Sequence, residues 1–589
     1  MHAVAAMTKA PSTGPSLLPA HRCHPAIRRS AAARAARVEQ DAGFLRFLRT
    51  CFMSSCRFRA SLLSLLLAPL CVHAAASEPG EWAGLIEVES RAAFWRLRAE
   101  FVDHQPRLAY AMPGGGVNAG GDWQPLQGAT MGDGRVGFTL PAAMGGITCA
   151  ARRDGEALLS AAADRCRLSM VQVASAAQPA VAPGLYRLGD GRLVSVGSFT
   201  DFPQPTVIEF GSGRWSFLFE RGAGVATAGP SLQSPWPVRL TLKQLPAQQQ
   251  GQRLLWAEAG AKPLVGERVH IVERPLRWTN GAMNLAGTLM LPATPGPHAA
   301  VVLAPMSTDA PREAYRQQAE FFVSQGLAAL IYDKRGVGES KGDTRETGLN
   351  DLADDAVAAA RLLKQQPGVD PRRIGVWGHS QGGWVAPIAA ARSSDVAFVI
   401  AQSGPSVTAA EQEIYRVETS AHNEGLSAAD VAEAADYERR LMHWVKSGEG
   451  REWLQAAART KTDARWAHLV EFHEKLPDLP SRRAQTFWYF DPLPSYAQVK
   501  VPMLAVFGDR DAFVPVERSV TLLRQALAQA GNRDHQITIL DHAAHGLWAT
   551  DLDSGHKAAT TTGFHADYFP TLVRWMKAQG LTGPGNGKP

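Results

Sequence analysis

The N-terminal part of the chain alternates apolar and polar residues over short runs. Between residues 81 and 274, Gly, Pro, Asp or Asn separates each run from the next. A period of two is typical of strands with one buried face, and many short strands with regular turns indicate small antiparallel sandwiches or barrels. The stretch AAQPAVAP, residues 176–183, interrupts the pattern, and LPAQQQGQ, residues 245–252, is a polar connector or exposed loop. We therefore predict an all-β region in two parts, residues 77–178 and residues 179–265.

The pattern changes over residues 266–589. Continuous apolar runs replace the alternation, and segments with a helical period lie between them. Apolar runs of this kind are typical of parallel strands that are buried on both faces. The expected strands cover residues 284–291, 299–305, 327–333, 373–378, 397–402, 502–508 and 536–540, and the expected helices cover residues 311–326, 349–366, 382–393, 516–531 and 568–580. This alternation predicts an α/β domain with a mostly parallel sheet and helices on both faces.

A long helical insertion, residues 407–494, interrupts this alternation and is rich in Trp, Tyr and Phe. Packing of the insertion onto the core accounts for most of these aromatic side chains. An insertion at this place can also act as a lid over a substrate pocket. We predict such a lid, with Trp488 and Tyr489 as candidate substrate-binding residues.

The leader, residues 1–76, carries most of the excess positive charge. It holds ten of the 61 basic and two of the 55 acidic side chains, so the formal charge of +6 becomes −2 for the remainder. A basic footprint for nucleic acid is therefore missing. From Met53 onward, two Arg precede an apolar run and then small residues, which is the order of a secretory signal. We expect export to the periplasm or medium, with Met53 as a possible start, and no later run is long enough to span a membrane.

Four of the six Cys lie in the leader, which leaves Cys149 and Cys166 in the exported protein. Two thiols in an oxidising compartment favour one disulfide. Two separate buried thiols are the alternative. Because the turn signal RDGE separates two β-like stretches that carry these cysteines, a bridge between them is geometrically reasonable.

Two serines lie in a G-x-S-x-G pattern, Ser380 in GHSQG and Ser340 in GESKG. Ser380 directly follows one predicted strand and directly precedes a predicted helix. This strand–turn–helix context is what a nucleophile elbow requires. Ser340 lies in a longer, turn-rich loop with no helix directly after it. We therefore predict Ser380 as the nucleophile, and the N–H of Gln381, at the start of the helix, as an oxyanion donor.

A serine nucleophile needs a base, and the base needs an acid that orients it. The loop after the expected strand at 502–508 offers Asp509 and Asp511. The loop after the strand at 536–540 offers Asp541, His542 and His545. Both loops follow the carboxyl ends of strands, where parallel sheets place their catalytic groups. The residue types alone do not choose among these candidates.

The motifs YDKRGVGES, DPRRIGVWGHSQGGWVAP, FGDRDAFVP and HAAHGL resemble those of the α/β-hydrolases. Over residues 266–589 the chain is similar to exported bacterial esterases of the prolyl-oligopeptidase-like and dienelactone-hydrolase-like branches. The family pattern G-x-x-D-x-x-V-P implies Asp511 as the acid, and the His before Gly implies His545 as the base. The family usually has His-Gly after its third strand. Here the sequence is LAPMSTD, and since Pro305 has no N–H, Met306 becomes the expected second oxyanion donor.

The sequence thus predicts an exported serine hydrolase that cleaves carboxylic esters through an acyl-enzyme. A serine peptidase of the aminopeptidase or prolyl-peptidase kind is the alternative, because the same triad serves both bonds. A catalytically silent binding protein with this fold is a further alternative from another class. We expect a small-molecule ester as the partner and no cofactor or metal, since no H-E-x-x-H or C-x-x-C spacing occurs.

Overall fold

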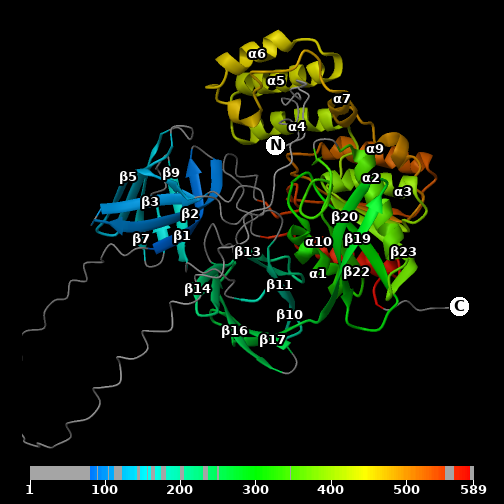
Figure 1. The fold of residues 1–589 in the computed structure, drawn as a ribbon, viewed down its shortest axis with the longest axis horizontal. Coiled ribbons are helices and arrows are strands. Elements are labelled where there is room, and N and C mark those ends of the chain that lie inside the picture. The colour runs from blue at the N-terminus through cyan, green and yellow to red at the C-terminus, as the bar shows by residue number, and fades with distance from the viewer. Residues whose placement is uncertain are drawn as a thin grey trace, which may run out of the picture. The chain divides into compact units, whose positions relative to one another are not determined.

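A computed structural model describes residues 80–88, 91–103, 105–111, 123–141, 146–154, 157–160, 166–173, 181–198, 205–229, 236–248, 251–344, 347–550 and 563–583. The leader and its predicted signal peptide lie outside these residues. The described strands form three sheets, and each sheet is built from a separate part of the chain, the first sheet being the most N-terminal (Figure 1).

The first sheet is antiparallel and has the strand order β4-β3-β2-β1-β9-β8-β7-β6-β5. Its strands are β1 (Gly80–Val88), β2 (Arg91–Val102), β3 (Gln105–Ala111), β4 (Gln124–Pro125), β5 (Gln127–Gly132), β6 (Arg135–Thr139), β7 (Thr148–Asp154), β8 (Ala157–Leu159) and β9 (Cys166–Val173). Their alternating side chains enclose a small core that includes Trp82, Trp95 and Phe138. The predicted disulfide is present in this core and joins Cys149 to Cys166.

The second sheet is also antiparallel, in the order β13-β12-β11-β10-β18-β17-β16-β15-β14. Its strands are β10 (Gly184–Leu188), β11 (Leu193–Gly197), β12 (Thr206–Glu209), β13 (Trp215–Phe217), β14 (Phe219–Gly222), β15 (Val225–Ala228), β16 (Leu240–Gln248), β17 (Gly251–Glu258) and β18 (Leu264–Arg268). The all-β character of the N-terminal region is therefore confirmed. Because β18 pairs with β10 through Arg268, the second sheet extends slightly past the predicted boundary at residue 265.

The third sheet is mixed and has the order β19-β20-β22-β21-β23-β24-β25-β26. Its strands are β19 (Ile271–Asn280), β20 (Met283–Pro292), β21 (His298–Ala304), β22 (Ala328–Tyr332), β23 (Val369–His379), β24 (Phe398–Gln402), β25 (Met503–Gly508) and β26 (His535–Leu540). β20 pairs in antiparallel fashion with both β19 and β22, and the pairings among β21 to β26 are parallel. The sheet therefore aligns the carboxyl ends of its parallel strands along one edge.

Helices cover both faces of this sheet, as the sequence predicts. Successive residues of β21 face opposite cores: Val302 packs in the core with α2 (Leu349–Leu363), α3 (Gln381–Arg392) and α9 (Val516–Gln529). Val301 packs in the opposite core with α1 (Arg316–Ser324) and α10 (Tyr568–Ala578). Strands β22, β24 and β25 are almost entirely apolar because each of their side chains is buried on one face or the other.

The chain between β24 and β25 is helical and contains α4 (Ala409–Asn423), α5 (Ala428–Ser447), α6 (Arg451–Thr460), α7 (Arg482–Trp488) and α8 (Leu493–Tyr496). These helices correspond to the predicted lid and are yellow to orange in Figure 1. Thr408 and Ser427 cap the first two helices through side-chain oxygens that accept backbone N–H groups. Their own core contains Tyr437, Trp466 and Phe472. Among the described residues, the helices are all too short or too polar to cross a membrane.

Candidate active site

Ser380 lies on a sharp turn between β23 and α3. Its backbone has φ 56° and ψ −116°, a left-handed conformation that costs free energy for a residue with a Cβ. A Cβ on Gly378 would overlap the carbonyl of Gly382, and a Cβ on Gly382 would overlap the carbonyl of Ala304, so both glycines are required sterically. The N–H of Ser380 donates to the carbonyl of Gln402 at 3.0 Å, which fixes the turn to β24. This geometry is that of a nucleophile elbow.

Ser340, the other serine in the pattern, has a structural role. Its side chain is buried, and its hydroxyl donates to the carbonyl of Asp333 at 2.6 Å. The same hydroxyl accepts the N–H of Ala286 at 3.0 Å. These two bonds fasten the loop after β22 to β20 and leave the hydroxyl without a catalytic base.

His545 and Asp511 are brought together from two different loops, after β26 and β25. His545 Nδ1 lies 2.8 Å from Asp511 Oδ2 and 3.1 Å from Oδ1. The Asp511 carboxylate is buried, and its Oδ1 also accepts the N–H groups of Phe513 and Val514 at 2.8 and 2.9 Å. Since Nδ1 faces a carboxylate, the neutral imidazole holds its proton there and leaves Nε2 as the basic nitrogen.

The other candidates in these two loops lie elsewhere. Asp509 contacts Arg510 at 3.7 Å, and its Oδ1 accepts the N–H of Ala543 at 3.3 Å, so it ties the two loops together. His542 is exposed on the turn, and its φ is 50°. Asp541 contacts His565 at 3.5 Å. Of the acids and histidines that the sequence left open, the buried Asp511 and the partly buried His545 form a hydrogen-bonded pair.

The loop that carries His545 is fastened to the elbow of Ser380. The carbonyl of His545 accepts the hydroxyl of Ser403 at 2.7 Å and lies 3.2 Å from His379 Nε2. The rings of His379 and His545 are 5.0 Å apart. Burial and, to a smaller extent, the charge of the neighbouring His545 together lower the pKa of His379 to about 3. His379 is therefore neutral at ordinary pH, and its N–H donates to the carbonyl of His545.

The loop after β21 lies beside the start of α3. The two segments are so close that a Cβ on Gly382 would overlap the carbonyl of Ala304. Gln381 begins α3, as the sequence predicts, so its N–H is one of the first free donors of that helix. The N–H of Met306 instead donates to the hydroxyl of buried Tyr315 at 3.0 Å. In this conformation, the donor expected at Met306 is already occupied.

The two aromatic residues predicted to bind substrate pack within the insertion. Trp488 is buried, at the end of α7. The hydroxyl of Tyr489 donates to the carbonyl of Met442 at 2.7 Å, and Lys446 lies over its ring at 5.3 Å. Both contacts of Tyr489 join the end of α7 to α5, and Trp488 is part of a buried apolar core, so these side chains are accounted for by packing.

Two aromatic residues that the sequence analysis did not select lie nearer to the acid and base. The ring of Phe513 is 4.9 Å from that of His545, and Phe513 is 44% exposed. Tyr415 on α4 donates its hydroxyl to the carbonyl of Asp511 at 3.1 Å. The signal for Phe513 was its position inside the motif DAFVP, next to the acid. Tyr415 had no local signal, because its contact depends on how the insertion folds back.

The second β-sheet contacts the loop that follows His545. The ring of Trp548 packs edge-on against Trp215 of β13, with centroids 5.1 Å apart, and stacks on Phe564 at 4.2 Å. The N–H of Phe564 donates to the carbonyl of Gly213 at 2.8 Å. This packing braces the loop from the side of the second sheet.

Residues 280–546 match the model of a family described as X-Pro dipeptidyl-peptidase (S15 family). The match runs from the end of β19 to the residue after His545 and includes the elbow and the acid. The antiparallel β20 is followed by parallel strands in the order β22-β21-β23, with the elbow directly after β23. The C-terminal half of the chain therefore has the α/β-hydrolase fold. The resemblance stated from the motifs is thereby confirmed for this domain.

Several curated proteins are similar to parts of this domain. Polyketide transferase claH of Penicillium crustosum is 39% identical over 121 residues, which are 20% of this chain and 39% of that protein. Thiohydrolase aneE of Aspergillus aculeatus is 35% identical over 123 residues, 21% of this chain and 38% of that protein. Esterase EstD of Thermotoga maritima is 26% identical over 303 residues, 50% of this chain and 65% of that protein. The chain thus spans less than two thirds of the length of each of these relatives.

Among solved structures, the α/β hydrolase GrgF from Penicillium sp. is similar at a TM-score of 0.34 and 19% identity, over 52% of this chain and 98% of that one. The esterase Pf2001 from Pyrococcus furiosus is similar at a TM-score of 0.33 and 16% identity, over 53% of this chain and 91% of that one.

Proposed function

We propose that this chain is an exported serine hydrolase that cleaves carboxylic esters, with Ser380 as nucleophile, His545 as base and Asp511 as orienting acid. The observation that carries the proposal is the pair of His545 and the buried Asp511, joined by a bond of 2.8 Å, on a loop that His379 fastens to the elbow of Ser380. A histidine held in one tautomer beside a strained serine turn is the arrangement that activates a hydroxyl for acyl transfer.

In the proposed reaction, Ser380 Oγ attacks the carbonyl carbon of the ester while His545 Nε2 takes the hydroxyl proton. The tetrahedral intermediate collapses when the same proton passes to the leaving alcohol. A water molecule then attacks the acyl-enzyme, again with His545 as base, and releases the acid. Asp511 keeps the imidazole in its orientation and stabilises the imidazolium through the buried Nδ1 bond.

The negative charge on the carbonyl oxygen needs donors that are in place before the reaction. The N–H of Gln381 is one proposed donor, because it begins α3 directly after the nucleophile. The second comes from the loop after β21, where the sequence assigns it to Met306. Since the N–H of Met306 donates to Tyr315, this second assignment requires that bond to be released on substrate binding.

The names of similar proteins support acyl transfer but not a single substrate. An esterase, a thiohydrolase and a polyketide transferase are among them. The family description names a peptidase, and this match favours a second candidate function, cleavage of a peptide bond after proline. A panel of nitrophenyl esters, acyl thioesters and Xaa-Pro anilides separates the candidates. We expect the esters to be turned over fastest; turnover of the anilides alone would favour the peptidase.

Labelling with a fluorophosphonate probe tests the nucleophile. We expect the wild-type chain to be labelled and Ser380→Ala to lose both labelling and ester turnover, by on the order of 10³ or more. Ser340→Ala is the matched control, since it removes a hydroxyl from the same sequence pattern. It should cost about 1 kcal/mol of stability through its two lost bonds and leave the folded protein active. Labelling that survives in Ser380→Ala would overturn the assignment.

Export remains a proposal that rests on the charged, apolar and small-residue order after Met53. The test is N-terminal sequencing of the protein recovered from the periplasm or medium of an expressing bacterium. We expect cleavage after Ala74 or Ala76. Recovery of the uncleaved chain from the cytoplasm alone would refute export.

A further inference from the structure

Lys334 is buried under the loop that follows β21, and it has no part in the reaction described above. Its side chain is 6% exposed. The ammonium lies 3.3 Å from the carbonyl oxygen of Met306, 3.1 Å from that of Ser307 and 3.4 Å from Asp309 Oδ1. One buried cation thus holds two consecutive peptide groups of a single loop.

The burial of this charge is costly and is not explained by packing. Desolvation lowers the pKa of Lys334, which is the direction expected when the charged form loses water. Its carboxylate partner, Asp309, is 43% exposed, so this ion pair is only partly shielded. An apolar side chain of similar length would fill the same space without the desolvation cost. A role for the charge itself is therefore the better explanation.

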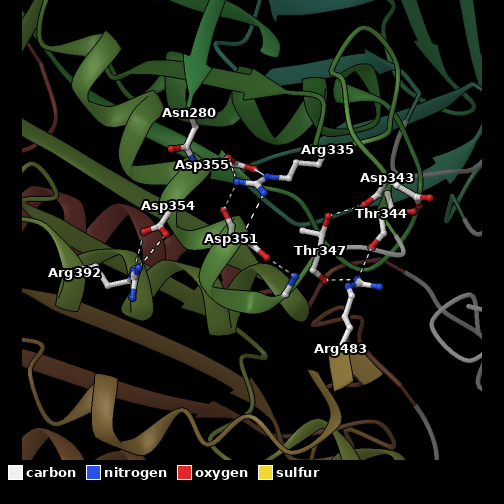
Figure 2. A network of polar contacts seen from close by, with 11 residues as sticks. Asn280, Arg335, Asp343, Thr344, Thr347, Asp351, Asp354, Asp355, Arg392 and Arg483 are labelled. Carbon is white, nitrogen blue, oxygen red and sulfur yellow. Dashed lines mark hydrogen bonds and ion pairs between the residues drawn. The ribbon is translucent and has the colours of Figure 1, made fainter. Parts of the chain in front are cut away.

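The remainder of the loop that bears Lys334 is fixed by other residues (Figure 2). Arg335 donates to both oxygens of Asp355, at 2.6 and 2.8 Å. Arg483 of α7 donates to the carbonyls of Thr344 and Thr347, at 3.0 and 2.6 Å. These contacts hold the backbone on either side of the turns at Gly336, Gly338 and Gly342. Loss of the Lys334 amine therefore leaves this loop anchored.

The loop after β21 has a second, independent anchor at its far end. Asp333, the neighbour of Lys334, accepts the N–H and the guanidinium of Arg312 at 2.7 and 2.6 Å. Lys334 therefore acts on the part of the loop that lies between β21 and this anchor. That part contains Met306 and Ser307. It begins beside the elbow, where the carbonyl of Ala304 lies against Gly382.

The contacts of Lys334 with two carbonyl groups fix the orientation of the N–H groups in the same peptides. In a trans peptide the C=O and the N–H point in opposite directions. The carbonyls of Met306 and Ser307 face the ammonium, so the N–H groups of the same two peptides, on Ser307 and Thr308, face away from it. A cation on a carbonyl also polarises the N–H of that peptide and makes it a stronger donor. The N–H of Met306 belongs to the preceding peptide and donates to Tyr315.

We propose that Lys334 is a positioning residue of the oxyanion site: its ammonium holds the Met306 and Ser307 carbonyls so that the N–H groups of Ser307 and Thr308 face the acyl oxygen. This inference rests on the proposed serine hydrolase function and moves the second donor from Met306 to the two peptides that follow it. Lys334 touches neither the substrate nor the reacting atoms. It acts through the backbone of the loop.

The test replaces Lys334 by Met, which keeps the length of the side chain and removes the charge. We expect kcat for a nitrophenyl ester to fall by about 10- to 100-fold with little change in KM, because a small misplacement of donors weakens only the transition state. Lys334→Arg should recover most of kcat, since it restores a cation at the two carbonyls. Lys341→Met is the matched control: Lys341 lies on the same loop but is exposed, and its replacement should leave kcat unchanged.

A trifluoromethyl ketone provides a readout that a general loss of stability would not move. Ser380 Oγ adds to its carbonyl carbon, the hydroxyl proton passes to His545, and the carbonyl oxygen keeps the electron pair as an oxyanion. We expect the affinity for this inhibitor to fall in Lys334→Met by the same factor as kcat/KM. Thermal unfolding of each variant checks the fold, and Lys334→Gln takes the place of the Met variant if the latter does not fold.

The outcomes separate this inference from the proposed function. An active, fluorophosphonate-labelled wild type whose Lys334→Met variant retains the kcat and inhibitor affinity of Lys341→Met would overturn the role of Lys334 alone. A fall in kcat that Lys334→Arg does not recover would also overturn it. A wild-type chain that neither labels nor turns over any ester would overturn both proposals.

Discussion

Glu320 on α1 provides a quantitative test of how the second β-sheet and the α/β-hydrolase domain pack together. Its carboxylate is 1% exposed and accepts the hydroxyl of Ser195 on β11 at 2.5 Å. Next to it, Gln317 donates to the carbonyl of Ser195 at 3.2 Å. Burial raises the pKa of Glu320 from 4.5 to about 7, while the bond from Ser195 and the positive Arg316 act in the opposite direction.

The sign of the effect on stability follows from this shift. Below about pH 4.5 the carboxyl is protonated in both states, and its ionisation does not oppose folding. Between pH 4.5 and about 7 the unfolded chain ionises first, so unfolding releases a proton and the free energy of unfolding falls as the pH rises. The full shift corresponds to roughly 3 kcal/mol, at 1.4 kcal/mol for each pKa unit.

Glu320→Gln removes the ionisable group and keeps an amide that can bond to Ser195. We expect the variant to be more stable than the wild type at about pH 8, by up to roughly 3 kcal/mol, and the difference to become smaller at about pH 5. The assay is urea unfolding at both pH values, monitored by tryptophan fluorescence and compared through midpoints with a shared slope. Glu267→Gln, on exposed β18, is the control and should show no such pH dependence. A difference that is the same at both pH values would refute the reasoning, because Glu320 would then be ionised in the folded protein.

Three further predictions follow from the site and the first sheet. Asp511→Asn should lower kcat by about 10⁴-fold because it favours the wrong tautomer of His545, the proposed base, whereas Asp509→Asn should be milder; equal small losses would place the acid elsewhere. Phe513→Ala should change the preference among acyl chain lengths, because this exposed ring lies against that histidine, and an unchanged profile in a folded variant would exclude contact with substrate. The Cys149–Cys166 bridge spans 17 residues, and its reduction should destabilise the first sheet by about 3 kcal/mol and leave ester turnover at mild temperature intact. Two titratable thiols in the unreduced, denatured protein would contradict the bridge.

The sequence by itself determined the classes of structure along the chain. Alternation with a period of two predicted the antiparallel sheets, and uninterrupted apolar runs predicted a parallel sheet that is buried on both faces. These signals are local, since they depend on how each residue in turn faces a core. The choice of Ser380 over Ser340 was also local, because a nucleophile elbow needs a strand directly before it and a helix directly after it.

Other features were decided only by the tertiary structure, because they depend on contacts between segments that are distant in the chain. The N–H of Met306 was an expected donor from its place after a strand, but the direction of a peptide group is set by partners such as Tyr315 and Lys334. Tyr489 was a candidate pocket residue because it lies in an aromatic-rich insertion. Its hydroxyl instead donates to a backbone carbonyl of a neighbouring helix in that insertion. Phe513 is exposed beside the histidine because two loops from adjacent strands meet there. A pattern of apolar and polar positions specifies which face of an element is buried, and it carries no information about which distant backbone group a buried side chain will meet.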